Sequence, residues 1–254
     1  MLEVIQIPVL QDNYLYLIID KPTGLTACID PAVADPVISK LKELNKNLDY
    51  ILNTHHHYDH VGANLELKEK YNCRIIGNEK DKERIPGINI FVNEGDNFNV
   101  GESNSIVMAV SGHTIGHICY HFPEDKLIFC GDTLFSLGCG RLFEGSPDIM
   151  VESLLKLRSL PNETKVYCAH EYTLQNALFA LSLEPNNEAI KKKIDKIKDL
   201  RSKNLPTIPS TLAEEKKLNP FLKFDDKNFL NSIGLNESSS TDNFRVIRQM
   251  KDNF

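Results

Sequence analysis

Short apolar blocks recur along the first 170 residues and predict strands that alternate with helices. The runs LYLIID (15–20) and LTACID (25–30) are separated by Pro22 and Gly24, which predicts two strands joined by a turn. The segment DPVISKLKELNK (35–46) has the Asp-Pro opening of a helix. Further strands are expected at LDYILNT, RIIG, IVMAVS, ICYHF, KLIFCGD and KVYCAH, and further helices at NLELKEKY and IMVESLLKLRSL. This order is typical of sheets that lie between helical layers.

The pattern changes near residue 172. The segments LQNALFALSL (174–183) and EAIKKKIDKIKDLRSK (188–203) carry apolar residues at three- and four-residue spacing, which is the period of a helix. The segment LPTIPST (205–211) interrupts this pattern, and a polar tail follows. We therefore expect a mixed α/β body of residues 1–171, followed by a mainly helical part of residues 172–254.

Composition narrows the class of protein. Of 254 residues, 41% are hydrophobic and 25% are charged. This composition is typical of a globular protein and excludes a disordered, collagen-like or coiled-coil chain. No apolar run approaches the roughly 18 residues that cross a bilayer, and Met1–Gln6 does not resemble a signal peptide, so we expect a cytoplasmic protein with no membrane partner. The net charge of −6 argues against nucleic acid as a partner. Six cysteines without a C-x-x-C pair are expected to be reduced thiols.

Four of the eight histidines lie in the segment HHHYDH (55–60), directly after a predicted strand. Residues two apart in a strand point to the same side, so His55 and His57 would project together and His56 away from them. Asp59 and His60 follow in the turn before the next helix, where both side chains can reach the same pocket. The pattern predicts a metal site; the alternatives are a histidine-rich loop without function or adventitious metal binding.

Three more residues of ligand type, His113, Asp132 and His170, each follow an apolar run, where loops converge to build sites. A catalytic zinc ion typically takes three protein ligands, so the candidates are too many for one ion and suit two. Asp132 is the expected bridge because a carboxylate has two oxygens; its alternative role is to cap a turn. Zinc is the expected metal, and iron and manganese accept the same ligand types. The seven candidates are His55, His57, Asp59, His60, His113, Asp132 and His170.

Three other polar residues near these motifs have open roles. We interpret His117 as a structural residue or as a partner of a ligand, and His121 as a strand histidine outside the site. Asp30, which ends the predicted strand LTACID, would either accept a hydrogen bond from a ligand imidazole or serve an ordinary turn.

The motifs resemble a known family. The segments THHHYDH, SGHT, FCGDTLF and CAHEY look like the metallo-β-lactamase superfamily, and GCGRLFEG, AHEYT and the C-terminal segments are similar to glyoxalase II, the hydroxyacylglutathione hydrolases, of bacterial type. The resemblance covers essentially the whole chain. It implies an αββα sandwich of residues 1–171 with a C-terminal, mainly helical, substrate-binding domain of residues 172–254. It also implies that His55, His57 and His113 hold one ion, that Asp59, His60 and His170 hold a second, and that Asp132 bridges them.

The same resemblance implies a substrate and its contacts. The family hydrolyses S-D-lactoylglutathione to glutathione and D-lactate in the second step of methylglyoxal detoxification. Tyr172, Arg141 and Phe143, with Arg248 and Lys251 of the tail, would contact the glutathione part. Arg141 and Phe143 stand where eukaryotic relatives have lysine and tyrosine, so the Phe143 position has no hydroxyl. On sequence alone, Arg248 and Lys251 also fit a solvated charged tail.

Two ions would lower the pKa of a shared water molecule and polarise a carbonyl, which is the chemistry of hydrolysis. Asp59 would orient the attacking hydroxide, and a thiolate whose parent thiol has a pKa of about 8.5 leaves without a general acid. We expect a monomer acting on a small-molecule glutathione thioester. The alternatives are another hydrolase of the superfamily, a persulfide dioxygenase with a single iron, or a non-catalytic metal-binding protein; a nuclease would require a basic channel.

Overall fold

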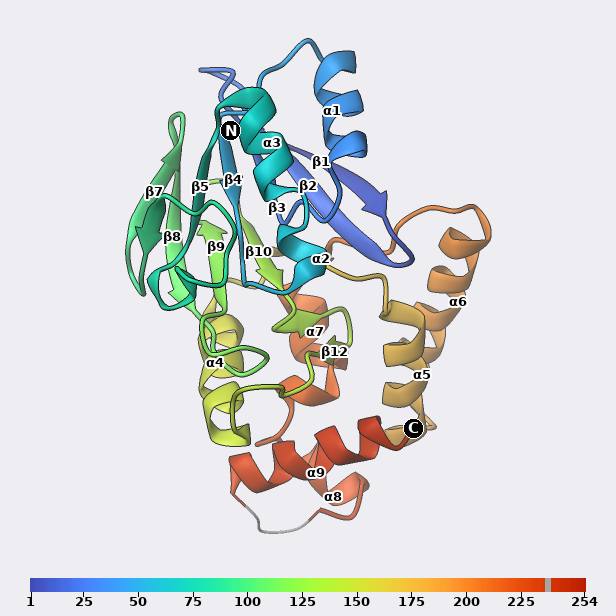
Figure 1. Ribbon diagram of the computed structural model, residues 1–254. Coiled ribbons are helices and arrows are strands. Elements are labelled where there is room, and N and C mark those ends of the chain that lie inside the picture. The colour runs from blue at the N-terminus through green and yellow to red at the C-terminus, as the bar shows by residue number, and fades with distance from the viewer. Residues whose placement is uncertain (236–238) are drawn as a thin grey trace. The chain divides into compact units, whose positions relative to one another are not determined.

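The computed structural model describes residues 1–235 and 239–254 (Figure 1). Two compact units make up the described chain. The first contains residues 1–109 and 114–131, and the second contains residues 110–113 and 132–254. No helix within the described residues is long and apolar enough to span a membrane.

The first unit begins with a mixed sheet of six strands. Its first three strands are antiparallel, and the following three are parallel. The predicted strands at 15–20 and 25–30 are confirmed as the second and third of these. In sheet order the strands are β1 (Leu2–Val9), β2 (Asn13–Asp20), β3 (Thr26–Ile29), β4 (Tyr50–Leu52), β5 (Arg74–Asn78) and β6 (Ile90–Val92).

Three helices of this unit are α1 (Ala34–Glu43), α2 (Tyr58–Val61) and α3 (Asn64–Tyr71), and a short 3₁₀ turn spans Glu79–Asp81. The apolar sides of α1 and α3 pack on the first sheet: Leu41 and Leu67 share one buried cluster with Leu17 and Ile51. Because each strand contributes alternate residues to this face, the helices bury it without altering the other face.

Four strands of a second sheet lie in the same unit and pair antiparallel with one another: β7 (Asn97–Val100), β8 (Ser103–Ala109), β9 (Ile118–Phe122) and β10 (Leu127–Gly131). This sheet packs against the first sheet through aromatic contacts. The rings of Tyr16 and Phe129 lie 5.4 Å apart, and the buried Tyr120 hydroxyl donates to the carbonyl oxygen of Asn53 at 3.0 Å. The first unit therefore has helix, sheet and sheet layers, with β4 ending at the buried interface between the sheets.

The second unit is mainly helical, as the spacing in 174–183 and 188–203 predicts. Residues Ala180, Ile190, Ile194 and Leu218 form part of its apolar cluster. Its elements are β11 (Leu134–Phe135), β12 (Gly138–Cys139), α4 (Pro147–Ser159), β13 (Lys165–Cys168), α5 (Thr173–Leu183), α6 (Glu188–Ser202), β14 (Ser210–Thr211), α7 (Leu212–Leu218), a 3₁₀ turn at Pro220–Leu222, α8 (Lys227–Ser232) and α9 (Ser240–Asp252).

Asp20 ties the end of β2 to the turn between β7 and β8 in the first unit. Its carboxylate is fully buried and accepts from the Thr23 hydroxyl at 2.7 Å, the Ser103 hydroxyl at 2.8 Å and the Glu102 amide at 3.2 Å. Burial by itself would raise the pKa of Asp20, but these hydrogen bonds outweigh it and lower the pKa below the ordinary value.

Replacing Asp20 should therefore destabilise the first unit in a pH-dependent way. We expect Asp20→Ala to lower the free energy of unfolding by about 2–4 kcal/mol at pH 7, because several buried donors lose a charged acceptor. The lowered pKa means that the carboxylate stabilises the fold above the unfolded-state pKa and loses this effect as the pH falls through the folded-state pKa. Urea unfolding at pH 7 and at pH 3 should show the difference between wild type and variant shrinking in acid; a constant difference would contradict this role.

Candidate metal-binding and catalytic site

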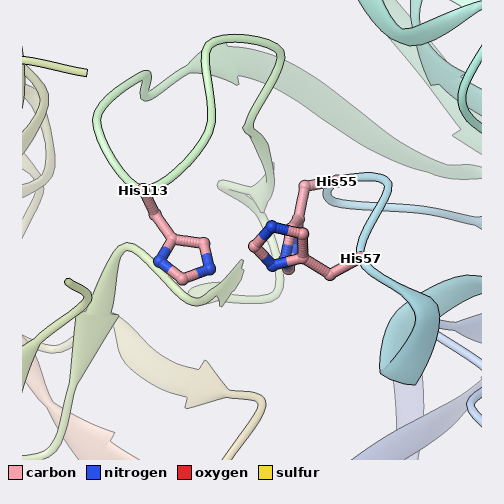
Figure 2. Close-up of side chains that lie close together, drawn as sticks. All are labelled: His55, His57 and His113. Atoms are coloured by element: carbon pink, nitrogen blue, oxygen red, sulfur yellow. The ribbon is translucent and has the colours of Figure 1, made fainter. Parts of the chain in front are cut away.

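The first unit brings His55 and His57 together, but in the loop after β4 rather than in a strand, so strand alternation is not the reason for their proximity. Both residues follow β4 and precede α2, and their ring centroids lie 4.6 Å apart (Figure 2, which also draws His113). The ring of His60 lies 4.0 Å from that of His55. His56 points elsewhere, because its Nδ1 lies 3.3 Å from the buried Asp81 carboxylate.

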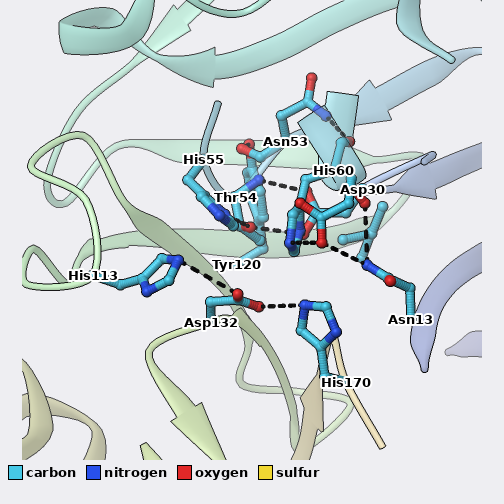
Figure 3. A network of polar contacts seen from close by, with 12 residues as sticks. Asn13, Asp30, Asn53, Thr54, His55, His60, His113, Tyr120, Asp132 and His170 are labelled. Atoms are coloured by element: carbon cyan, nitrogen blue, oxygen red, sulfur yellow. Dashed lines mark hydrogen bonds and ion pairs between the residues drawn. The ribbon is translucent and has the colours of Figure 1, made fainter. Parts of the chain in front are cut away.

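A buried hydrogen-bond network contacts the Nδ1 atoms of His55 and His60 (Figure 3). Asp30 accepts from the Thr54 amide at 2.8 Å and the Thr54 hydroxyl at 2.7 Å, and it lies 3.0 Å from Nδ1 of His60. The Thr54 hydroxyl in turn lies 3.1 Å from Nδ1 of His55. An ionised carboxylate can only accept, so the network places a proton on Nδ1 of both imidazoles and leaves each Nε2 as the ligand atom. Asp30 is thus a partner of ligand-type histidines rather than an ordinary turn residue.

Asp59 and His60 are the other two residues of metal-ligand type in the first unit. The Oδ2 atom of Asp59 lies 3.6 Å from Nε2 of His60. Two ligands of one tetrahedral ion, at metal–ligand distances of about 2.0–2.2 Å, are roughly 3.3–3.6 Å apart. The backbone at this point is fixed as well, because the side-chain amide of Asn53 donates to the His60 carbonyl oxygen at 3.0 Å. The pair therefore has the spacing of two ligands that share an ion.

The second unit brings the other three candidates together. Both oxygens of the buried Asp132 carboxylate face an imidazole: Oδ2 lies 3.4 Å from Nε2 of His113, and Oδ1 lies 3.3 Å from Nε2 of His170 (Figure 3). Both distances match the separation of two ligands on one ion. Nδ1 of His113 lies 2.8 Å from the Arg141 carbonyl oxygen and donates to it, which leaves Nε2 for a metal.

The two remaining histidines of the 113–121 region lie in the first unit. His117 is fully buried, and its ring stacks on that of His55 at 4.6 Å and 19°. His121 lies in β9, where burial lowers its pKa and so favours the neutral ring. Because its ring stacks on that of His55, His117 supports a ligand-type imidazole by packing, whereas His121 does not take part.

Three of the expected substrate contacts lie beside the ligand-type residues of the second unit. The ring of Tyr172 stacks on that of His170 at 4.8 Å and an interplanar angle of 1°. Phe143 is 58% exposed, and its ring lies 5.0 Å from that of His113. The exposed Arg141 guanidinium lies 5.3 Å from the centre of the Phe143 ring. Aromatic surface and a cation therefore border this cluster.

The tail cations lie on α9 and are not part of a solvated end. Arg248 is only 8% exposed; its Nη1 donates to the Cys139 carbonyl oxygen at 2.9 Å, and its Nη2 pairs with Asp252 at 2.9 Å. Lys251 is less enclosed, with Nζ 3.3 Å from the Gln175 carbonyl oxygen and 5.4 Å from the centre of the Phe179 ring. Burial, and then the charge of Arg248, lower the pKa of Lys251.

Sequence reasoning missed the residues that orient the ligand types. Asn53 and Thr54 hold the histidine segment, yet they look like ordinary residues at the end of a strand. The Arg141 contact to His113 uses a main-chain carbonyl, which carries no side-chain signal. The position of Thr54, directly before the first histidine of the motif, was the available clue.

The fold and these two clusters define the class of protein. Residues 13–170 match the family model of the metallo-beta-lactamase superfamily. The crystal structure of ETHE1 from Myxococcus xanthus aligns with a TM-score of 0.70 at 27% identity, covering 99% of this chain and 91% of that chain. The chain therefore has the metallo-β-lactamase fold with a C-terminal helical region, as its motifs predict.

The particular family follows from full-length relatives. Residues 171–254 match the model "Hydroxyacylglutathione hydrolase C-terminus". The chain is 48% identical to a hydroxyacylglutathione hydrolase from Methylococcus capsulatus over 254 residues, covering 100% of this chain and 99% of the relative. A relative of the same name from Pelagibacter ubique is 48% identical over 245 residues, covering 96% and 97%. The chain belongs to the hydroxyacylglutathione hydrolase family, which confirms the resemblance seen in its sequence.

The two tail cations should differ in their effect on stability. Arg248→Ala removes a buried hydrogen bond from a charged donor and a ring contact, so we expect a loss of about 2–3 kcal/mol in the free energy of unfolding. Lys251→Ala should cost less than about 1 kcal/mol, because its side chain is more exposed. Urea unfolding of both variants measures the difference, and equal losses would contradict it.

Proposed function

We propose that this chain hydrolyses S-D-lactoylglutathione to glutathione and D-lactate, as the second step of methylglyoxal detoxification, with two divalent metal ions. Membership of the hydroxyacylglutathione hydrolase family makes it a metal-dependent hydrolase and supports a glutathione thioester as the substrate. The observation that carries the two-ion part is the arrangement of Asp132, whose two oxygens each lie at ligand-to-ligand distance from a different imidazole.

The imidazole and carboxylate ligands fit two divalent metal ions. We assign His55, His57 and His113 to the first ion, Asp59, His60 and His170 to the second, and Asp132 to both. Imidazole and carboxylate favour zinc, and iron and manganese are compatible. When bound, the ions would lower the pKa of a water molecule and polarise the thioester carbonyl.

The protein residues supply orientation. Asp30 and Thr54 fix the tautomers of His60 and His55, so each imidazole presents Nε2 without a change of protonation. Asp59 accepts a hydrogen bond from the attacking water and directs it toward the carbonyl. The leaving glutathione thiolate has a parent pKa of about 8.5, so the chain needs no side chain to protonate it.

Cations and aromatic rings of the second unit would bind the glutathione part. Glutathione carries two carboxylates, for which Arg141 and Lys251 offer charge. Phe143 and Tyr172 offer ring surface, and Phe143 contributes apolar contact because it has no hydroxyl. Arg248 already donates to Cys139 and Asp252. We therefore assign it two roles, which are to contact the glutathione part and to hold α9 in place.

We extend the proposal to organisation and location. The two family models meet at residues 170 and 171, which supports a metal-binding domain of residues 1–171 and a substrate-binding domain of residues 172–254. All six cysteines are free and buried, in keeping with a cytoplasmic protein. We propose a monomer. The other superfamily activities are less favoured because the full-length relatives above carry the hydroxyacylglutathione hydrolase name.

Replacing Asp132 tests the two-ion assignment. Asp132→Ala should leave well below two ions per chain and lower kcat by orders of magnitude, because one side chain serves both ions. Metal per chain is counted by mass spectrometry, and turnover is measured with S-D-lactoylglutathione. Asp199→Ala, at an exposed aspartate of α6 paired with Lys203, is the matched control. Two tightly bound ions and near-normal turnover in Asp132→Ala would overturn the assignment.

Replacing Lys251 or Arg141 tests the glutathione contacts. Each charge-assisted contact to a carboxylate is worth roughly 1.5–3 kcal/mol, which corresponds to about a tenfold to a hundredfold increase in KM. The kcat value should change little, because these cations bind ground state and transition state alike. A small thioester without the glutathione peptide should be hydrolysed equally by wild type and both variants. An unchanged KM for the glutathione thioester would refute the contacts.

A further inference from the structure

We infer that Asn13 is a positioning residue that orients the Asp59 carboxylate for the second metal ion. The inference rests on the proposed function in one respect, namely that Asp59 is a ligand of that ion. The observation behind it is a buried side-chain amide that contacts Asp59 from a strand 46 residues earlier in the chain.

The β1–β2 hairpin places Asn13. A turn of three residues joins the strands, with Val9 paired to Asn13 across its base and Leu10 in the left-handed region at φ 52°. This register makes Asn13 the first residue of β2. Asn13 is 6% exposed (Figure 3 labels it beside the histidine network). A buried amide needs hydrogen-bond partners, so its contacts define its role.

Asn13 contacts Asp59 at two points. Its Nδ2 atom donates to Oδ2 of Asp59 at 2.9 Å and to the main-chain oxygen of Asp59 at 3.3 Å. A carboxylate and a carbonyl are both acceptors, which assigns the amide nitrogen rather than the oxygen to this side. The two hydrogens of a single amide group therefore restrain the backbone and the side chain of Asp59 together.

The main-chain contact has a local reason. Helix α2 contains only four residues, and the amide of Ala63, which would bond the Asp59 carbonyl in a longer helix, donates to Pro31 at 2.9 Å instead. Asn13 thus donates to the Asp59 carbonyl from outside the helix. This fixes the start of α2 relative to β2 and holds the residue from which the carboxylate projects.

The side-chain contact has a chemical consequence. The oxygen that Asn13 holds is the one that lies 3.6 Å from Nε2 of His60, the separation of two ligands on one ion. The Asp59 side chain is 37% exposed, and rotation about its terminal bond is soft, whereas His60 is buried and held by Asp30. A donor on one carboxylate oxygen therefore reduces the reorientation that metal binding would require.

Zinc binding to the metal-free, full-length protein tests this role. Bound zinc per chain is measured against a competing chelator for wild type, Asn13→Ala and Asn13→Leu, the last of which keeps the branched side-chain shape but cannot donate. Asn104→Ala is the matched control, since the side-chain amide of Asn104 lies in β8 and donates to the exposed Asn97 side chain at 3.4 Å. We expect both Asn13 variants to bind the first zinc ion as wild type does and the second about tenfold to a hundredfold more weakly.

Turnover provides the second measurement. With zinc at saturation, the Asn13 variants should show a reduced kcat and an unchanged KM for the glutathione thioester, because Asp59 acts on the attacking water and not on glutathione. Wild-type affinity for the second zinc ion in both variants would overturn the inference. So would an equal weakening of both ions with a lower melting temperature of the metal-free protein. A wild-type chain that binds two zinc ions without hydrolysis overturns the proposed function, and the zinc comparison then still decides the role of Asn13.

Discussion

The buried carboxylate of Asp30 organises the histidine-rich segment of the first unit. It accepts from the backbone and hydroxyl of Thr54 and from Nδ1 of His60, and Thr54 passes the constraint to His55. A buried charge is costly unless it is fully hydrogen-bonded, so these contacts are formed together. Their combined effect is to set the ring orientation and tautomer of two ligand-type histidines within the protein itself.

The second unit uses the same physical device with different atoms. Nδ1 of His113 donates to the Arg141 carbonyl oxygen, so that Nε2 faces Asp132. In both units one ring nitrogen is committed to an acceptor and the other is presented. This division matters because imidazole binds a metal only through a deprotonated nitrogen, and a ring of uncertain tautomer would present the correct atom only part of the time.

The C-terminal helix α9 shows that charged residues of a polar segment can hold a helix in place. Arg248 on α9 donates to Cys139 at the end of β12 and lies 4.8 Å from the centre of the Phe221 ring, while Lys251 lies over Phe179. The aliphatic parts of such side chains pack on aromatic rings, and their charges make cation–π contacts with them. A helix with a polar sequence can therefore still be held in place by packing. A polar tail is therefore compatible with a well-packed helix.

Local pattern in the sequence determined much of this protein. The strands at 15–20 and 25–30 follow from apolar runs bounded by turn residues, and the helices at 174–183 and 188–203 follow from a period of 3.6 residues, which neighbouring residues alone set. The family was evident from contiguous motifs. The tertiary structure decided the roles of Asn13, Asp30 and Arg248, whose partners lie 46, 24 and 109 residues away along the chain. An asparagine in a turn or an arginine in a tail has the same local pattern whether or not it has a partner, and only the folded arrangement of strands and helices brings that partner within hydrogen-bond distance.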